Sequence, residues 1–191
     1  MKVKELLKLC GEMANLSFSA DDESTDGQES VQGESETKDG VAKRLLNCCN
    51  FTLEELYRDY ATSLRKTVIE VVDGFADTSA YRMCRVISLV DGEGNDVKYR
   101  YTEGGLSVDG DGKYNLCYAR LPNDVTLDDD VTLPSPRITE RVLAYGILRE
   151  YFAVVGDTAT ASQWDERYKN ALRIADVKCS SMRMPPVGRW I

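Results

Sequence analysis

The side chains of this sequence that could perform catalysis or bind a metal are carboxylates and cysteines. The 191 residues include no histidine, which is the usual general base near neutral pH and the commonest nitrogen ligand of metals. A cysteine nucleophile would therefore lack its usual imidazole partner. The adjacent acids Asp128, Asp129 and Asp130 could act together in hydrolysis, but acids between extended flanks are more typical of a solvated turn. A carboxylate-dependent hydrolase is therefore kept only as a third hypothesis.

The segment from Asp91 to Asp96 has the alternating oxygen donors of a calcium loop. In a calcium loop that starts at Asp91, position six would be glycine and position twelve glutamate, but this sequence has Asp96 and Thr102 there. The motifs of serine hydrolases, P-loop nucleotide-binding proteins and zinc proteases are also absent. We therefore expect no catalytic residue, no metal site and no cofactor, and so no enzyme.

The six cysteines do not form a metal or redox motif. None has Cys-x-x-Cys spacing, the first residues lack the apolar stretch of a signal peptide, and no run of about eighteen apolar residues could span a membrane. We expect reduced, mostly buried thiols in a cytosolic product that does not enter a membrane. The adjacent pair would point to different faces of a helix. The cysteines are Cys10, Cys48, Cys49, Cys84, Cys117 and Cys179.

The charge of the chain is concentrated in one segment. The chain has 24 basic and 32 acidic residues, a net charge of −8 and a pI near 4.7. Residues 17–40 contain eight acids and one lysine, so this segment alone carries −7 and the rest is close to neutral. Broad nucleic-acid binding is not expected, because it needs clustered Lys and Arg. The segment has few apolar residues, which predicts a mobile acidic loop: either a solvated linker, or an electrostatic arm that binds a partner.

Helical periodicity marks the two ends of the chain. Residues 3–15 have one apolar face and predict an amphipathic helix, and the period resumes over residues 41–64, as one helix or as two with a break near Asn50. Thr52 followed by Glu55 resembles a capping box. Beyond a polar, proline-bounded connection at residues 121–136, we expect a central buried helix at 138–155 and an amphipathic helix at 160–178. The expected core of this C-terminal helix pair is Tyr145, Tyr151, Trp164, Tyr168 and Leu172.

The middle of the chain is rich in β-branched and aromatic residues and in glycine and aspartate. This composition predicts short strands joined by tight turns at residues 91–96 and 109–112. Close spacing favours antiparallel pairing in a meander. The expected strands are residues 67–72, 83–90, 97–101, 106–108 and 114–121.

Together these elements predict an α+β fold: an antiparallel helical bundle with an inserted small antiparallel β domain, a long acidic loop and an extended C-terminal arm. The bundle comprises residues 1–65 and 137–178, and the β domain and its connection comprise 66–136. Residues 179–191 hold prolines that forbid a helix, and apolar side chains that are unfavourable in water. This segment is either an extended arm that docks on a partner or a tail folded back on its own domain.

Three stretches resemble the head-to-tail adaptor proteins of tailed bacteriophages, the group that includes tail tubular protein A and the neck ring proteins. They are a strand that ends in Tyr118-x-x-Leu121-Pro122, a helix with Ala144-Tyr145-Gly146-x-x-x-Glu150-Tyr151, and a helix that opens on Trp164-Asp165-x-Arg167-Tyr168. The resemblance covers most of residues 41–190 and the first helix. The acidic segment at 17–40 is long for this family.

The resemblance implies a non-catalytic virion protein, assembled in the host cytoplasm. It would form a ring, usually dodecameric, beneath the portal protein, and would contact neighbouring copies and another neck or tail protein. DNA would only pass through. A C-terminal extension often reaches the portal in this family, so the arm is expected to bind the portal through Arg183, Met184, Arg189, Trp190 and Ile191.

The alternative function from another class is a non-enzymatic regulatory or scaffolding factor. In that case the acidic loop would mimic nucleic acid and occupy a basic partner.

Overall fold

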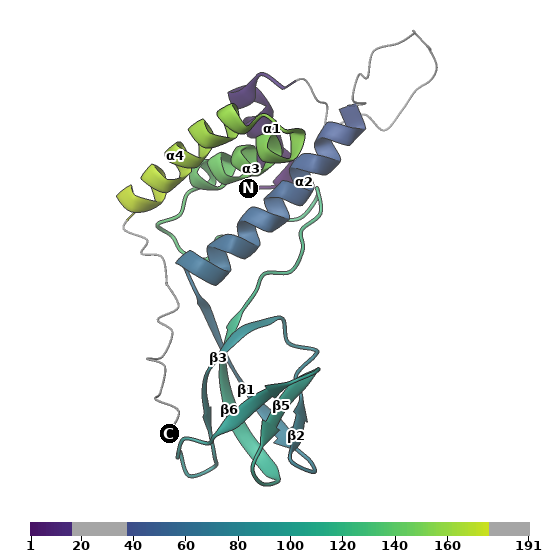
Figure 1. The fold of residues 1–191 in the computed structure, drawn as a ribbon, viewed down its shortest axis with the longest axis vertical. Helices are drawn as coiled ribbons and strands as arrows, with labels where there is room; N and C mark the ends of the chain where they lie inside the picture. Colours follow the sequence, from purple (N-terminus) through teal and green to yellow (C-terminus); the bar gives the residue numbers. More distant parts are fainter. Residues whose placement is uncertain (17–37, 176–191) are drawn as a thin grey trace, which may run out of the picture. The chain divides into compact units, whose positions relative to one another are not determined.

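The computed structural model describes residues 1–16 and 38–175 (Figure 1). The predicted α+β class is confirmed, since two small antiparallel sheets are inserted between the second and third helices. The chain divides into two compact units, each described here by itself. The helical unit lies within Met1–Glu55 and Asp124–Lys178, and the described part of the β unit is Leu56–Asn123.

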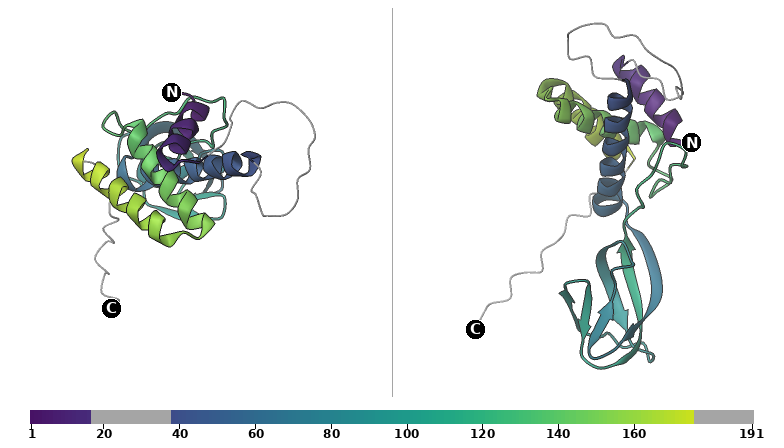
Figure 2. Two further views of the ribbon diagram at one scale, coloured as in Figure 1. Left: turned by 90° about the horizontal axis from the view of Figure 1, so that it is seen from above. Right: turned by 90° about the vertical axis from the view of Figure 1, so that its right-hand side faces the viewer.

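The third helix lies at the centre of the helical unit and packs against the other three (Figure 2). Its buried residues occupy more than one face, as the sequence predicts for a central helix. Gly156 ends it in a left-handed conformation with φ 91°, and the Asp157 side chain caps the next helix by accepting from the Thr160 N–H at 3.0 Å. The helices are α1 (Val3–Ala14), α2 (Lys38–Glu55), α3 (Glu140–Val155) and α4 (Thr158–Ile174).

The region predicted as helix at residues 41–64 is partly wrong at its end. Helix α2 continues through Asn50 without a break and ends at Glu55, followed by the single π turn Leu56–Tyr60. The capping-box interpretation is also wrong, because Thr52 lies inside α2 and its hydroxyl donates to the Cys48 carbonyl at 2.8 Å. Leu64 belongs to a strand. Its spacing from the preceding apolar residues fitted a helical period by coincidence.

The β unit contains six strands in two sheets, with orders β1-β6-β3 and β2-β5-β4. All pairs are antiparallel, as predicted, but the meander is wrong because the last strand lies between the first and the third. The three-residue strand β2 was missed, since it is too short to show periodicity. The strands are β1 (Ser63–Val71), β2 (Phe75–Asp77), β3 (Met83–Val90), β4 (Tyr99–Thr102), β5 (Gly105–Val108) and β6 (Gly112–Arg120).

Buried side chains of both sheets form the core of the β unit. Ile69, Leu106 and Leu116 are at most 3% exposed and belong to one hydrophobic cluster. A Cβ at Gly105 would lie 2.1 Å from the Ala76 carbonyl oxygen, so the close approach of β2 and β5 requires glycine there.

The connection at residues 121–136 has no regular secondary structure, as predicted. Part of it runs along the start of α1, where the Val3 N–H donates to the Asp129 carbonyl at 3.0 Å and the Val131 N–H to the Met1 carbonyl at 3.0 Å. The Asn50 side chain of α2 makes two hydrogen bonds with the backbone of Val125. These contacts fix the chain where it returns to the helical unit. Helix α4 ends at Ile174, and residues 176–178 of its predicted range lie outside the described residues.

We predict that Gly146→Ala destabilises the protein. A Cβ at this position would lie 2.3 Å from Cγ2 of Thr52 and 3.1 Å from the Tyr168 ring. Overpacking of this kind costs about 2 kcal/mol, which exceeds the gain of about 1 kcal/mol in helix propensity. Urea unfolding measures the effect. Thr52→Ser removes the clashing methyl group and keeps the hydroxyl, so it should rescue Gly146→Ala. Equal stability of wild type and Gly146→Ala would contradict this packing.

Candidate interaction surfaces

Four of the five residues predicted as the core of the C-terminal helix pair are buried, and Tyr145 of α3 meets Trp164 of α4. Tyr168 is fully buried, and Tyr151, Trp164 and Leu172 are at most 7% exposed. Tyr145 is half-buried at the edge of this contact, with its ring centroid 5.8 Å from that of Trp164. The predicted portal-binding residues Arg183, Met184, Arg189, Trp190 and Ile191 lie outside the described residues.

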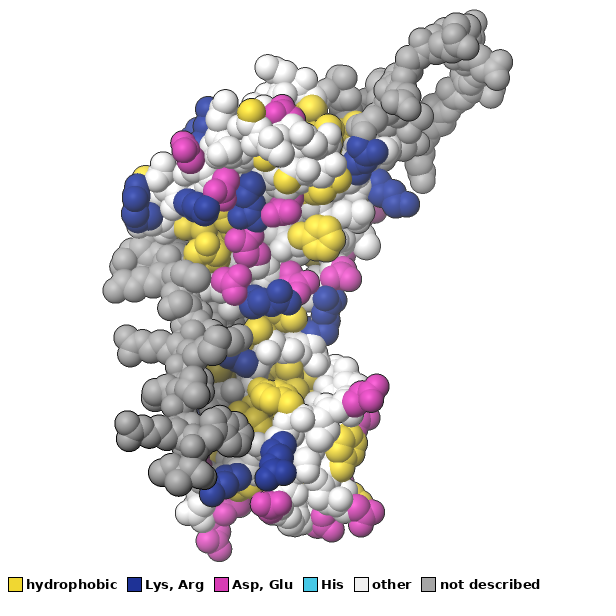
Figure 3. Space-filling model, in the orientation of Figure 1, with side chains coloured by type: hydrophobic (Ala, Val, Ile, Leu, Met, Phe, Trp, Pro, Cys, Tyr) yellow, Lys and Arg dark blue, Asp and Glu magenta, His cyan; other side chains and the backbone are white. Residues whose placement is uncertain are grey.

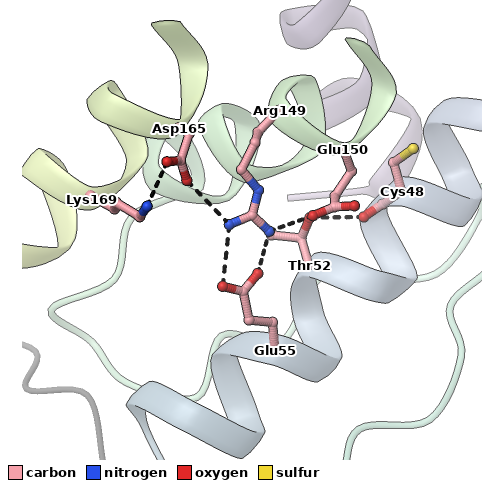
Figure 4. A network of polar contacts seen from close by, with 7 residues as sticks. All are labelled: Cys48, Thr52, Glu55, Arg149, Glu150, Asp165 and Lys169. Atoms are coloured by element: carbon pink, nitrogen blue, oxygen red, sulfur yellow. Dashed lines mark hydrogen bonds and ion pairs between the residues drawn. The ribbon is translucent and has the colours of Figure 1, made fainter. Parts of the chain in front are cut away.

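Arg149 of α3 makes ion pairs that join three helices (Figure 4). Its guanidinium binds both carboxylate oxygens of Glu55 from α2, and it lies 2.5 Å from Glu150 and 3.7 Å from Asp165 of α4. The Arg149 side chain is only 18% exposed. Burial lowers its pKa, but hydrogen bonding and charge from Glu55 and then from Glu150 outweigh this, so its pKa lies above the ordinary value. Arg149 therefore keeps its positive charge among these carboxylates.

Asp165 also accepts a bond from Lys169 at 2.6 Å, an i,i+4 pair within α4. Arg149 itself was not singled out from the sequence. The sequence did contain a signal for it: Arg149 is a charged residue between the apolar positions Leu148 and Tyr151 of a helix expected to be buried, and a buried charge needs a partner.

A groove of about 550 Å³ lies between the start of α3 and the end of α4. Its lining includes no acidic residue among those described, but three arginines, of which Arg141 and Arg167 belong to helices and are exposed. The floor is apolar, and Ile174 at its edge is 85% exposed. The lining residues are Arg137, Thr139, Arg141, Val142, Tyr145, Arg167, Asn170, Ala171, Ile174 and Ala175.

Aromatic rings orient the two helical arginines of this groove. The Arg141 guanidinium lies 5.8 Å from the Tyr145 ring centroid, and its Nε donates to the Tyr145 hydroxyl at 2.8 Å. The Arg167 guanidinium lies 4.5 Å from the Trp164 ring centroid. A guanidinium stacked on a ring keeps N–H groups for a carboxylate. The sequence signal was the helical spacing of each arginine from its aromatic partner, which was not recognised.

A second surface is the outer face of the sheet β1-β6-β3. Strand β1 is at its edge. Leu64 and Val68 of this strand and Val72, which directly follows it, are 56%, 58% and 60% exposed, and the charged residues Lys66 and Glu70 lie between them on the same face. Their spacing of four residues places them on one face of the extended chain. Figure 3 shows hydrophobic side chains reaching the surface over this unit. An exposed apolar edge strand is typical of a protein-binding surface.

Two of the carboxylates considered for chemistry, Asp91 and Asp129, accept hydrogen bonds that hold turns. Asp91 accepts from the backbone N–H groups of Glu93 and Asn95 at 2.8 and 2.9 Å, and the bonds from Asn95 lower its pKa most. Asp129 accepts from the backbone and hydroxyl of Thr126, which lowers its pKa in the same way. No cluster of residues able to hold a metal occurs within residues 1–16 and 38–175.

No protein-family description matches the chain, and no curated protein matches it. Among the described helices, none combines the length and the apolar character that crossing a membrane requires.

Replacing Arg149 by methionine should destabilise the helical unit by about 3 kcal/mol, because it removes the guanidinium that Glu55 and Glu150 share at a partly buried site, while Asp165 keeps Lys169. Chemical denaturation measures the loss. Lys169→Met is the matched control: Lys169 is 64% exposed, and a surface pair contributes at most about 0.5 kcal/mol. Similar losses for both variants would show that burial does not strengthen the Arg149 contacts.

Thiol labelling should distinguish the described cysteines. Burial raises the pKa of Cys48 to about 11 and that of Cys49 to about 12, and it also raises the pKa of Cys10. A maleimide at pH 8 should therefore modify the partly exposed Cys84 and Cys117 first. Mass spectrometry of tryptic peptides gives the order. All five should react at similar rates in urea, and early modification of Cys49 in the native protein would contradict the packing of α2.

Proposed function

We propose that the protein is a structural virion component, a head-to-tail adaptor that forms a ring beneath the portal and joins the capsid to the tail. The observation that carries the proposal is the presence of two exposed surfaces of different chemistry on different units. The arginine-lined groove belongs to the helical unit, and the apolar row Leu64, Val68 and Val72 belongs to the β unit. A ring needs different faces on each copy, because only a head-to-tail contact repeats around an axis.

The motif residues that carry the resemblance to phage adaptors support the proposal through their packing. Gly146 lets α3 approach Thr52 of α2, and Trp164 packs against Tyr145 across α3 and α4. Asp165 meets Arg149. The motif residues thus make the contacts that hold the helices of this unit together. Proteins that share a fold need such packing residues at equivalent positions.

The proposed partners are the portal protein, neighbouring copies of this chain and another neck or tail protein. The ring would be dodecameric, as is usual in the family that the chain resembles. DNA would pass through the ring as cargo. Outside residues 17–40 the chain is close to neutral, so its wall would hold the phosphate backbone weakly, whereas a basic wall would bind it.

The charge of −7 on residues 17–40 supports the alternative, a regulatory or scaffolding factor that occupies a basic partner. The two functions differ in assembly. A nucleic-acid mimic acts as a single copy, and it loses its target when Asp21 to Gly40 are deleted. An adaptor without these residues should still assemble.

Negative-stain microscopy of purified portal assemblies mixed with the full-length protein tests the adaptor function. We expect an added ring on the portal. Absence of the protein from virions, or turnover of a small substrate by the purified chain, would refute the proposal.

Deletion of Cys179 to Ile191 should abolish attachment to the portal while the chain remains folded, because this segment carries Arg183, Arg189 and Trp190, which are frequent interface anchors. Co-sedimentation with portal assemblies measures attachment, and circular dichroism checks the fold. A deletion of equal length within residues 21–40 is the control and should attach. Unchanged attachment of the truncated chain would exclude the arm as the anchor.

A further inference from the structure

We propose that the arginine-lined groove between α3 and α4 binds the acidic loop end of the β unit of a second copy. This inference rests on the proposed ring and names its subunit contact. The groove offers Arg141 and Arg167, held over aromatic rings, with the apolar Val142 in its lining and Ile174 at its edge. A surface of this kind suits a partner that presents carboxylates in fixed positions.

Such carboxylates lie at one end of the sheet β1-β6-β3. Strand β1 ends with Val71 opposite Gly112, and β3 ends with Val90 opposite Asn115, so the loops that follow or precede these strands share one end. Figure 3 shows Asp and Glu side chains gathered at the lower end of this unit. Residues 72–74, 91–96 and 109–111 contain no Lys or Arg and six acids: Asp73, Asp91, Glu93, Asp96, Asp109 and Asp111.

Hydrogen bonds fix these loops. The Gly74 N–H donates to Asp111 at 2.9 Å, which joins two of them, and Asp91 accepts bonds from within its own loop. The acids at the tips, including Asp96 and Asp109, are exposed. Because the loops are already ordered, docking them loses little conformational entropy. The nearby Lys98 and Lys113 leave this end negative.

Two other segments of the chain could compete for the groove. The C-terminal residues carry Arg183 and Arg189, which have the same sign as the groove, so charge does not favour them. Residues 17–37 carry seven acids and match the groove in charge. We favour the β loops because their carboxylates are held in place. They also form a surface distinct from the groove, on the other unit, and a head-to-tail contact between copies joins two distinct surfaces.

Charge reversal on each side provides the test. The groove variant is Arg141→Glu with Arg167→Glu, and the loop variant is Asp96→Lys with Asp109→Lys, which leaves the turn-holding Asp91 and Asp111 unchanged. Sedimentation velocity of the full-length chain at low salt and rising concentration measures association without a portal. Wild type should associate, and each variant alone should associate at least about tenfold more weakly. An equimolar mixture should recover association, because each variant then meets an opposite charge.

Matched controls reverse exposed charges elsewhere in the helical unit: Lys8→Glu with Lys43→Glu, and Glu12→Lys with Asp128→Lys. Both should associate like wild type. If the groove variant loses secondary structure by circular dichroism, Arg141→Gln with Arg167→Gln replaces it and should weaken association in the same direction.

Several outcomes would overturn the proposal. Wild-type chains that stay monomeric, or variants that associate like wild type, exclude the contact. Association could instead recover in a chain that carries both the groove and the loop reversals, but not in the mixture of single variants. That result would place the contact between groove and loops within a single copy. Loss of association on deletion of residues 21–36, with the loop variant unaffected, assigns the groove to the acidic segment. Charge-dependent association without any ring on the portal would instead refute the adaptor function and leave this contact standing.

Discussion

The helical unit depends on the contacts that α3 makes with three other helices at once. At most positions these contacts are apolar, but at Arg149 a single guanidinium satisfies carboxylates from α2, α3 and α4. A buried ion pair adds little net stability compared with apolar packing, but the loss of one partner is costly, so the arrangement favours one register of the helices over others. Gly146 lies one turn earlier on α3, and its missing side chain sets how closely α2 and α4 approach α3.

This packing also creates the groove that we assign to subunit contact. Because α3 and α4 pack against each other, Arg141 of α3 and Arg167 of α4 line the same groove. Each arginine lies near an aromatic ring of the helix contact: Arg141 bonds to the Tyr145 hydroxyl, and Arg167 lies over the Trp164 ring. The stabilising core and the proposed recognition surface thus share Tyr145 and Trp164, so changes to either ring would alter both.

Sequence patterns predicted the elements well where a single local period controls them. The amphipathic first helix, the central helix ended by Gly156 and the strand at Met83–Val90 all follow from spacing and turn residues. Prediction failed where a local sequence pattern was compatible with two different structures. Leu64 continued a helical period but belongs to β1, and Thr52 resembled a helix cap but lies inside α2, where its hydroxyl bonds to the Cys48 carbonyl.

The sequence alone determined the fold class, the helix and strand periods and the concentration of negative charge in residues 17–40, because these depend on composition and on neighbours a few positions apart. Tertiary structure decided that β6 lies between β1 and β3, that Arg149 meets Glu55, and that Arg141 and Arg167 line one groove. Each of these depends on contacts between residues far apart in the chain. No local period encodes them, because they arise only when complete elements pack against one another.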